Sequence, residues 1–286
     1  MKSIFLTAFL ILDIIMISLC SSDKIDYSAT AQQKGWDIDA CKNGMAQSPI
    51  DININNLLFE NTYNFYSEKI KYNNFTFKAN IKATDNYINI YGDSTLKSIT
   101  AFTITYNDSQ TYEYYLDSIH FHVPSEHTIF NISIPAEAHF VHYLKNATIK
   151  RSALVFGVFF NLSSTDIPWV QSLKLSDHAS SLKASLGLVY TQTINSPREV
   201  LALAKGSVLK YEGSLTTPPC TEIVNWFVLE KMLPISEATL DILSLKTIRG
   251  GATDKGEFNN RYTQDLNKRT LTFGNMDLSM MMGDNS

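Results

Sequence analysis

The chain has 286 residues, of which 44% are hydrophobic, and its formal net charge at pH 7 is −4. That length is enough for one large domain or two small ones with a sizeable apolar core. The weak negative charge and the scattered lysines and arginines argue against nucleic acid as a partner.

The N-terminal segment has the pattern of a secretory signal peptide. Lys2 precedes the apolar run "IFLTAFLILDIIMISLCSS", which ends in small residues. Asp13 interrupts this run and leaves it too short and too polar to span a bilayer comfortably. We expect residues 1–22 to be removed by cleavage near Cys20 to Ser22, and an uncleaved anchor is the alternative. The C-terminal "MDLSMMMGDNS" lacks a hydrophobic tail, so we expect no stable membrane anchor.

Residues 23–286 are expected to form one secreted, extracellular domain, because no repeat or linker-like segment divides them. They keep two cysteines, Cys41 and Cys220. Such a pair in a secreted protein suggests one disulfide, and two unpaired buried thiols are the alternative. Five Asn-x-Ser/Thr sequons, which are candidates for glycosylation, fit the same compartment. They begin at Asn74, Asn107, Asn131, Asn146 and Asn161.

Alternating apolar residues predict strands in the middle of the chain. The segments "NYINIYG" and "AFTITYND" alternate and are rich in β-branched and aromatic residues. The continuous run "SALVFGVFFNL" is typical of a strand buried on both faces. Short helices are predicted after Pro168, after Pro197 and from Ser236, where "SEATLDILSL" has helical spacing behind a capping residue. Many strands with a few short helices indicate a mainly β or α+β fold.

Five of the six histidines lie between residues 120 and 142. On a strand, side chains alternate between two faces, so His120 and His122 of "SIHFHVPSEH" point the same way. Their Cα atoms would be roughly 6–7 Å apart, and the pair can share one ion. In "AEAHFVHY", His139 and His142 lie on opposite faces of the next predicted strand. Only one of these two can join the first pair.

A neighbouring carboxylate favours His139 as the third ligand. A metal-binding histidine usually gives its other N–H to a carboxylate or carbonyl, and Glu137 shares the face of His139. Three neutral imidazoles without a thiolate suit zinc and leave a fourth position open, as in catalytic sites. The alternatives are an H-x-H pair that binds no metal and a cluster of titrating groups that acts as a pH switch.

Four segments in order along the chain carry a family resemblance. They are "AQSPIDI", "IHFHVPSEHTI" followed by "AEAHFVHY", "YEGSLTTPPCTEIVNWFVL" and "NNRYTQDLNKRTL". They resemble the α-class carbonic anhydrases of the secreted type over nearly the whole mature chain. The resemblance implies a single domain built on a large, twisted, mostly antiparallel central β-sheet of about ten strands, with short surface helices.

The resemblance also implies a role for each matching residue. His120, His122 and His139 would bind one Zn²⁺, and zinc-bound hydroxide would attack carbon dioxide. Thr216 would accept a hydrogen bond from that hydroxide, and Glu126 would accept the proton of Thr216, which orients the nucleophile. Residues implied to support the ligands are Glu137, His127, Ser118 and Tyr211, and His142 is implied to be structural. Residues implied to line the substrate pocket are Val141, Val155, Leu215, Thr217, Val224 and Trp226, although core packing is an alternative for each.

The resemblance extends to the covalent framework. Cys41 and Cys220 stand where secreted members of the family carry a disulfide, which would hold the loop of Thr216. Ser48–Pro49 and Pro218–Pro219 match cis peptide bonds of the family.

The sequence departs from the family pattern at three places. The fastest members carry protons out of the pocket through a histidine, but no histidine precedes His120. In the corresponding segment "YNNFTF", Phe75 or a gap stands at that position, so we expect no proton shuttle. Ser118 replaces a glutamine that supports the first zinc ligand. Tyr27 has the spacing of a pocket tyrosine, but the tryptophan expected before it is Ile25.

These observations predict a secreted zinc enzyme that interconverts carbon dioxide and water with bicarbonate and a proton. Its expected partners are small molecules, carbon dioxide and bicarbonate, and the sequence does not predict its oligomeric state. The alternative is a non-catalytic binding or matrix protein of the same fold. Members that lost activity usually have a broken ligand set, whereas all three histidines are present here together with Thr216 and Glu126.

Overall fold

The computed structural model describes residues 25–53, 69–105, 110–146, 152–184, 187–244 and 258–275. The expected leader at residues 1–22 and the sequon residue Asn107 lie outside this part of the chain. The other four sequon asparagines are exposed: Asn74, Asn131, Asn146 and Asn161. Within the described ranges, no helix has the length and apolar character needed to cross a membrane.

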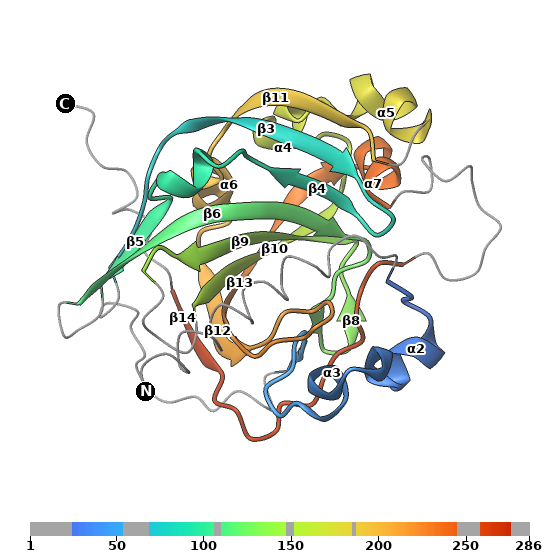
Figure 1. The fold of residues 1–286 in the computed structure, drawn as a ribbon, viewed down its shortest axis with the longest axis vertical. Coiled ribbons are helices and arrows are strands. Elements are labelled where there is room, and N and C mark those ends of the chain that lie inside the picture. The colour runs from blue at the N-terminus through green and yellow to red at the C-terminus, as the bar shows by residue number, and fades with distance from the viewer. Residues whose placement is uncertain are drawn as a thin grey trace, which may run out of the picture.

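A large twisted sheet of eleven strands crosses the molecule (Figure 1). Its strands are β2 (Lys69–Tyr72), β3 (Thr76–Ala83), β4 (Ile88–Tyr91), β5 (Phe102–Thr105), β6 (Thr111–His122), β9 (Ala136–Leu144), β10 (Ala153–Ser163), β11 (Val189–Asn195), β12 (Ser207–Gly213), β13 (Val224–Ser236) and β14 (Thr272–Asn275). The main path runs β11-β3-β4-β6-β9-β10-β13-β12-β14, and β5 pairs with β2 and β6. Among these described strands only β10 and β13 pair in parallel, which confirms the predicted mostly antiparallel sheet.

Short helices lie around the sheet, as predicted. They are α2 (Ala29–Gln33), α3 (Asp39–Asn43), α4 (Pro168–Ser172), α5 (Leu175–Ala184), α6 (Arg198–Leu203) and α7 (Glu237–Leu243), with 3-10 turns η1 (Gly35–Asp37) and η4 (Leu96–Ser98). The helices predicted after Pro168, after Pro197 and from Ser236 are confirmed as α4, α6 and α7. Ser236 caps α7, because its hydroxyl accepts a hydrogen bond from the Thr239 N–H at 3.3 Å.

The structure also contains a small second sheet of three strands. It contains β1 (Asp51–Ile52), β7 (Thr128–Ile129) and β8 (Ile132–Ser133). The three predicted strands of the sequence are also present. The segment "NYINIYG" contains β4 with alternating burial, "AFTITYND" contains β5, and the apolar run contains β10, whose first eight residues are all buried.

The main sheet separates two apolar layers. The larger cluster includes Phe121, Phe140 and Phe156, whereas the smaller one, on the other face, includes Val141 and Val155. Phe140 and Val141 are neighbours in β9, so strand alternation alone sends them to opposite layers. The histidines predicted to bind metal lie on the face of the smaller cluster.

A register shift in β6 aligns these histidines with their partners on β9. Tyr115 lies opposite Tyr143, but beyond the shift Ser118 lies opposite Val141 and His120 opposite His139. Asp117 is the extra residue, and a bulge of this kind changes which side chains face a given side. Without the shift, His120 would point into the large core.

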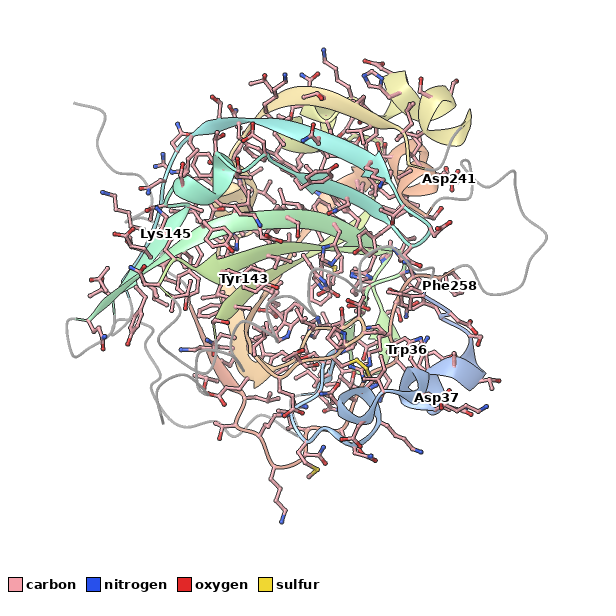
Figure 2. All side chains as sticks on the ribbon, viewed as in Figure 1. Trp36, Asp37, Tyr143, Lys145, Asp241 and Phe258 are labelled. Carbon is pink, nitrogen blue, oxygen red and sulfur yellow. A yellow bond between two sulfur atoms is a disulfide. The ribbon has the colours of Figure 1, made fainter. Side chains whose placement is uncertain are left out.

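One disulfide ties the N-terminal helices to the loop that precedes β13. Cys41 of α3 bonds to Cys220, 179 residues further along the chain, and the bond is drawn in yellow near Trp36 in Figure 2. The pairing confirms the bridge that the resemblance implied. Ser48–Pro49 and Pro218–Pro219 are cis, also as expected, and Val123–Pro124 is a third cis bond.

Removing this disulfide should destabilise the protein strongly, because the bridge closes a very long loop and so restricts the unfolded chain. The loop-closure relation gives a loss of about 5 kcal/mol for a loop of this length. We expect the double variant Cys41→Ser/Cys220→Ser to unfold at a much lower urea concentration than the wild type. Equal unfolding midpoints would show that the bridge contributes nothing to stability.

Candidate metal centre

Three histidines from two adjacent strands converge on one point. His120 and His122 of β6 share a face, and His139 of β9 lies directly across from His120. The ring centroids are 5.1 Å apart for His120 and His122, 5.2 Å for His120 and His139, and 4.6 Å for His122 and His139. One ligand nitrogen from each lies within 4.8 Å of the other two.

Two of these rings are held by hydrogen bonds on the nitrogen that faces away from the convergence point. His122 Nδ1 donates to the backbone oxygen of Asn259 at 2.6 Å, and His139 Nε2 donates to Glu137 at 2.9 Å. The opposite nitrogens, His122 Nε2 and His139 Nδ1, lie 3.4 and 3.9 Å from the same Glu126 oxygen. His122 Nε2 is buried and has no hydrogen-bond partner. Since buried polar atoms are almost always paired, this free nitrogen fits a bound metal ion.

Glu137 holds the site together from behind the histidines. Its carboxylate accepts hydrogen bonds from His139 Nε2 at 2.9 Å, from His127 Nδ1 at 2.7 Å and from the N–H groups of Glu126 and His127 at 3.0 and 2.9 Å. Burial alone would raise the pKa of Glu137, but the neighbouring His127 and His139 hold it well below its usual range. The carboxylate is therefore an anion at neutral pH.

A glycine in the neighbouring strand makes room for this carboxylate. Gly157 of β10 lies opposite His139, and a Cβ atom at Gly157 would come within 2.8 Å of the Glu137 carboxylate. Real Cβ contacts are not that short, so any larger residue would displace Glu137. This explains a glycine in the middle of a fully buried strand.

His127 forms the next link of the network rather than a metal ligand. Its Nε2 hydrogen-bonds to the Tyr211 hydroxyl at 2.6 Å, and that hydroxyl donates to Ser48 Oγ at 2.9 Å. A second group of metal-ligating types, His127, Glu137 and His139, also lies close together. Its facing atoms already bond to one another, so it leaves no free nitrogen for an ion.

Glu126 lies between the histidines and the loop that precedes β13. The Oε1 atom of its carboxylate accepts a hydrogen bond from the Arg261 N–H at 2.8 Å. The other oxygen, Oε2, is buried and has no hydrogen-bond partner among the described residues. Burial raises the pKa of Glu126 well above its usual value. Two hydrogen bonds, one with the Thr216 side chain and one with the Arg261 N–H, act in the opposite direction and lower this pKa. Thr216 itself is buried.

The buried histidines are neutral, as metal ligands must be. Burial lowers the pKa of His122 to about 3 and that of His120 well below its usual value. Burial also lowers the pKa of His139, despite the opposing effect of Glu137. Neutral imidazoles bind metal through their free lone pair, so no proton must be removed first near pH 7.

An apolar wall rises beside the histidines. Val141, Val155, Val224 and Trp226 belong to the smaller core cluster, and Leu215 packs against it. The Trp226 ring lies 4.8 Å from the His139 ring and 4.9 Å from that of His127. Thr217 is half-buried and follows Thr216 in the same loop. Five of the six predicted pocket residues therefore lie in or against one apolar cluster, and one of them, Trp226, contacts the His139 ring.

Three residues named in the sequence analysis make no hydrogen bond or ring contact to the three candidate ligands in the described part of the chain. His142 lies on the opposite face, where its Nε2 hydrogen-bonds to the Tyr72 hydroxyl at 2.8 Å. Ser118 shares the face of His120, but no hydrogen bond joins them. Phe75 packs against the large core cluster at the start of β3.

The register shows how far Phe75 lies from the histidines. Asn89 lies opposite His120 on one side and opposite Lys82 on the other. Phe75 is seven residues before Lys82 along the chain, which is roughly 23 Å on an extended strand. The place of Phe75 at the shuttle position stays a prediction from the resemblance. The nearby side chain from this hairpin is Tyr87, whose ring lies 4.8 Å from that of His120.

Several residues of the site did not stand out in the sequence. Asn259 binds His122 through its backbone, and its side chain accepts the Val123 N–H at 2.7 Å. The Arg261 guanidinium is buried and donates to Gln47, Ser48 and Cys41. Both lie in "NNRYTQDLNKRTL", but they act across more than a hundred residues of sequence, so no local pattern assigns their partners.

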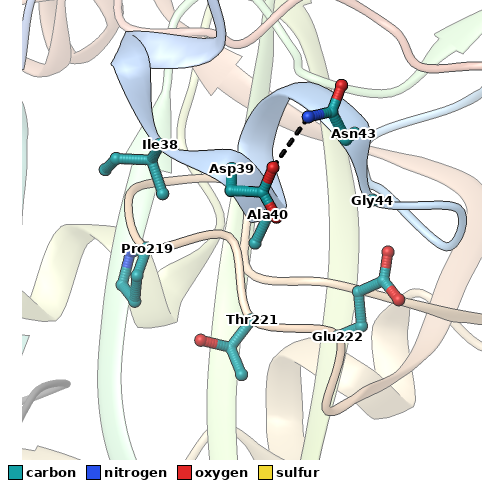
Figure 3. Close-up of a pocket in the computed structure, with 8 residues that line it drawn as sticks. All are labelled: Ile38, Asp39, Ala40, Asn43, Gly44, Pro219, Thr221 and Glu222. Carbon is teal, nitrogen blue, oxygen red and sulfur yellow. Dashed lines mark hydrogen bonds between the residues drawn. The ribbon is translucent and has the colours of Figure 1, made fainter.

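A separate cavity of about 520 Å³ lies between α3 and the loop that precedes β13 (Figure 3). It is lined by Ile38, Asp39, Ala40, Asn43, Gly44, Pro219, Thr221 and Glu222. Its acidic groups already have partners, because Asp39 accepts from Asn43 and Glu222 accepts from the Ala46 N–H. We assign no ligand to this cavity.

Comparisons with known proteins agree with one another. The family model described as eukaryotic-type carbonic anhydrase matches residues 31–274. "Alpha carbonic anhydrase 8" of Arabidopsis thaliana is 30% identical over 237 residues, which is 81% of this chain but only 54% of that protein. "Dioscorin dioA3" of Dioscorea japonica is 28% identical over 236 residues, which is 82% of this chain and 78% of that protein. The solved α-carbonic anhydrase of Thermovibrio ammonificans with sulfanilamide has a TM-score of 0.65 at 27% identity and covers 86% and 96% of the two chains.

The metal-free protein should lose stability as the pH falls from 7 to 5. Burial lowers the pKa of four histidines, so below about 6.5 the unfolded chain binds protons that the folded chain does not. Glu126, with its raised pKa, acts in the opposite direction, but it is one group against four. Each histidine contributes up to about 1.4 kcal/mol per pH unit.

Urea unfolding of the metal-free protein at several pH values measures this slope. The variant His142→Gln removes one of the four histidines without touching the candidate metal centre, so the net slope, four histidines less one glutamate, should fall by about a third. A free energy of unfolding that stays constant or increases on acidification would contradict the assignment of neutral buried histidines.

Proposed function

Because the chain belongs to the eukaryotic-type carbonic anhydrase family, we propose that it is a zinc enzyme that catalyses the reversible hydration of carbon dioxide to bicarbonate and a proton. The observation that carries the proposal is the convergence of one ring nitrogen each from His120, His122 and His139, of which His122 Nε2 is buried and unpaired. The rings of His122 and His139 are each aimed by a hydrogen bond on the other nitrogen, and His120 lies beside both. This is a three-histidine set without thiolate, which suits zinc with one position left open.

The residues of the candidate metal centre would have different roles in the reaction. His120, His122 and His139 would hold the ion, which supplies a hydroxide nucleophile at neutral pH by lowering the pKa of water. The Glu137 anion behind His139 offsets part of the positive charge and raises the basicity of that ligand. Glu137 also fixes the backbone of Glu126 and His127, so one carboxylate positions both a ligand and the catalytic carboxylate.

Glu126 and Thr216 would orient the nucleophile. The Thr216 side chain is hydrogen-bonded to Glu126. The positive charge of a bound ion would favour the ionised form of Glu126, and the Thr216 hydroxyl proton would then be directed at the carboxylate. Its oxygen lone pairs then remain free to accept a hydrogen bond from the nucleophile, which would align the attacking oxygen with the substrate. The apolar wall of Val141, Val155 and Trp226 suits a small apolar substrate such as carbon dioxide.

The competing function is a non-catalytic extracellular binding or matrix protein on the same fold. The likeness to dioscorin dioA3 is the observation that favours it. We prefer the enzyme because the three histidines, Glu126, Thr216 and Glu137 are all present and mutually arranged as the reaction requires. Zinc content together with carbon dioxide hydration distinguishes the two functions.

We further propose that the protein is exported through the secretory pathway. The Cys41–Cys220 disulfide supports an oxidising compartment, and the four described sequon asparagines are exposed to modification. Residues 1–22 would be the cleaved leader and residues 23–286 the enzyme domain. The chain spans 54% of the Arabidopsis relative, so its physiological partners are not transferred from that protein.

The central test is zinc content measured together with carbon dioxide hydration. We expect one zinc per chain in the wild type, and in His139→Ala a loss of zinc and of nearly all activity, because two imidazoles remain. His178→Ala, which changes the histidine outside the 120–142 cluster, is the matched control and should retain both. Full activity in a zinc-free His139→Ala protein would contradict the mechanism.

Proton release should limit the maximal turnover of the enzyme. No histidine precedes His120, and His178 lies on α5 stacked on Tyr190, so the pocket has no second histidine free to relay a proton. Small imidazole buffers should therefore raise kcat with saturation and leave kcat/KM nearly unchanged. Stopped-flow hydration at fixed pH and rising imidazole concentration measures this. Fast turnover that does not depend on buffer concentration would contradict it.

A further inference from the structure

The first ligand lacks the support that the other two have. His122 bonds to Asn259 and His139 to Glu137, but in the part of the chain that the structure describes no hydrogen bond reaches the His120 ring. Ser118, two residues earlier on the same face, makes none to it either. A ligand ring without such a bond is free to rotate away from the ion.

An aromatic side chain covers the His120 ring instead. The Tyr87 ring lies 4.8 Å from it in a tilted arrangement, at an interplanar angle of 31°. The two other ligand rings meet His120 edge-on, at 74° for His122 and 88° for His139. His120 is therefore packed by a tilted Tyr87 ring and edge-on by its fellow ligands, and these contacts restrict the rotation of its ring.

The turn that carries Tyr87 is fixed by its own hydrogen bonds. Tyr87 follows the turn between β3 and β4, where the Thr84 hydroxyl donates to the Tyr87 oxygen at 2.7 Å and accepts the Tyr87 N–H at 3.0 Å. The Thr84 N–H also donates to the Tyr87 oxygen at 2.9 Å. Asn86 Oδ1 accepts the Ile25 N–H at 3.0 Å, which ties the turn to the N-terminal segment.

The same turn is bonded to the residue that supports His122. Asn259 Nδ2 donates to the Asn86 oxygen at 3.0 Å and to the Phe121 oxygen at 2.9 Å. The backbone oxygen of Asn259 accepts from His122. Asn259 thus ties the Tyr87 turn to the ligand strand, so the backbone that carries the Tyr87 ring cannot move away from His120 without breaking these bonds.

We propose that Tyr87 is the positioning residue of His120, and that its ring, packed on the imidazole, performs the role that a hydrogen bond performs for the other two ligands. This inference rests on the proposed zinc function. The ring and not the hydroxyl provides the contact, so phenylalanine should substitute for tyrosine and an aliphatic residue should not.

Zinc affinity measured by competition with a chelator tests the proposal. We expect Tyr87→Leu to weaken zinc binding about tenfold or more, as for loss of other residues that orient metal ligands, and Tyr87→Phe to stay close to the wild type. The visible spectrum of the Co²⁺-substituted protein should change in Tyr87→Leu alone. Tyr190→Leu is the matched control, because it removes another tyrosine–histidine ring contact, at 3.8 Å from His178, away from the metal centre.

A glutamine at position 118 provides a rescue. Ser118→Gln places an amide two residues before His120 on the same face, so the double variant Ser118→Gln/Tyr87→Leu should recover zinc affinity. Equal zinc affinity and Co²⁺ spectra in a folded Tyr87→Leu protein and the wild type would overturn the proposal, and so would a Tyr87→Phe variant as weak as Tyr87→Leu. A wild type that binds no zinc would instead refute the proposed function.

An independent measurement needs no variant and covers the case in which Tyr87→Leu does not fold. In the zinc-loaded wild type, NMR should detect contacts between the ring protons of Tyr87 and the imidazole protons of His120. Their presence supports the packing. Their absence overturns the proposal.

Discussion

The candidate metal centre depends on one buried anion. Glu137 has no exposure to solvent, and its charge is balanced by four hydrogen bonds from His127, His139 and the backbone of Glu126 and His127. A carboxylate buried without such donors would be protonated, and it could then no longer accept from both imidazoles. Because the four donors come from β9 and from the segment after β6, satisfying this one charge fixes both strands. It also requires Gly157 on β10, since any side chain there would occupy the carboxylate's space.

The polar network around Glu137 lies on one face of the main sheet, opposite the large core. The large core behind the sheet, with Phe121, Phe140 and Phe156, makes the strands rigid, and strand alternation turns the histidines away from it. The smaller cluster in front excludes water from the histidines and leaves apolar side chains beside them. Burial then keeps the imidazoles neutral, which is the protonation state that binds metal. The disulfide ties down the loop that carries Thr216, and the Thr216 side chain hydrogen-bonds to Glu126 although the two are far apart in sequence.

Local sequence patterns correctly predicted features that depend on neighbouring residues alone, such as which face of a strand a side chain occupies. Alternation separated His120 and His122 from Phe121, and a continuous apolar run predicted the buried strand β10. The choice of His139 over His142 also followed from the face shared with Glu137, and His142 lies on the back of the sheet. Strand alternation could not locate the register shift at Asp117 or assign Asn259 to His122, because both depend on pairings between distant segments. Strand alternation also could not show which part of this hairpin lies beside the histidines: Phe75 packs against the large core, whereas the Tyr87 ring lies beside His120.

The claim that a single buried carboxylate organises the site is tested most directly by Glu137→Gln. The amide keeps the shape but removes the charge, and it presents a donor where His127 and His139 also donate. The zinc affinity of the folded variant should fall at least tenfold. By contrast, Glu222→Gln changes a carboxylate that lines the separate cavity of Figure 3, and this control should leave the zinc affinity unchanged. A folded Glu137→Gln protein that binds zinc as tightly as the wild type would contradict the account.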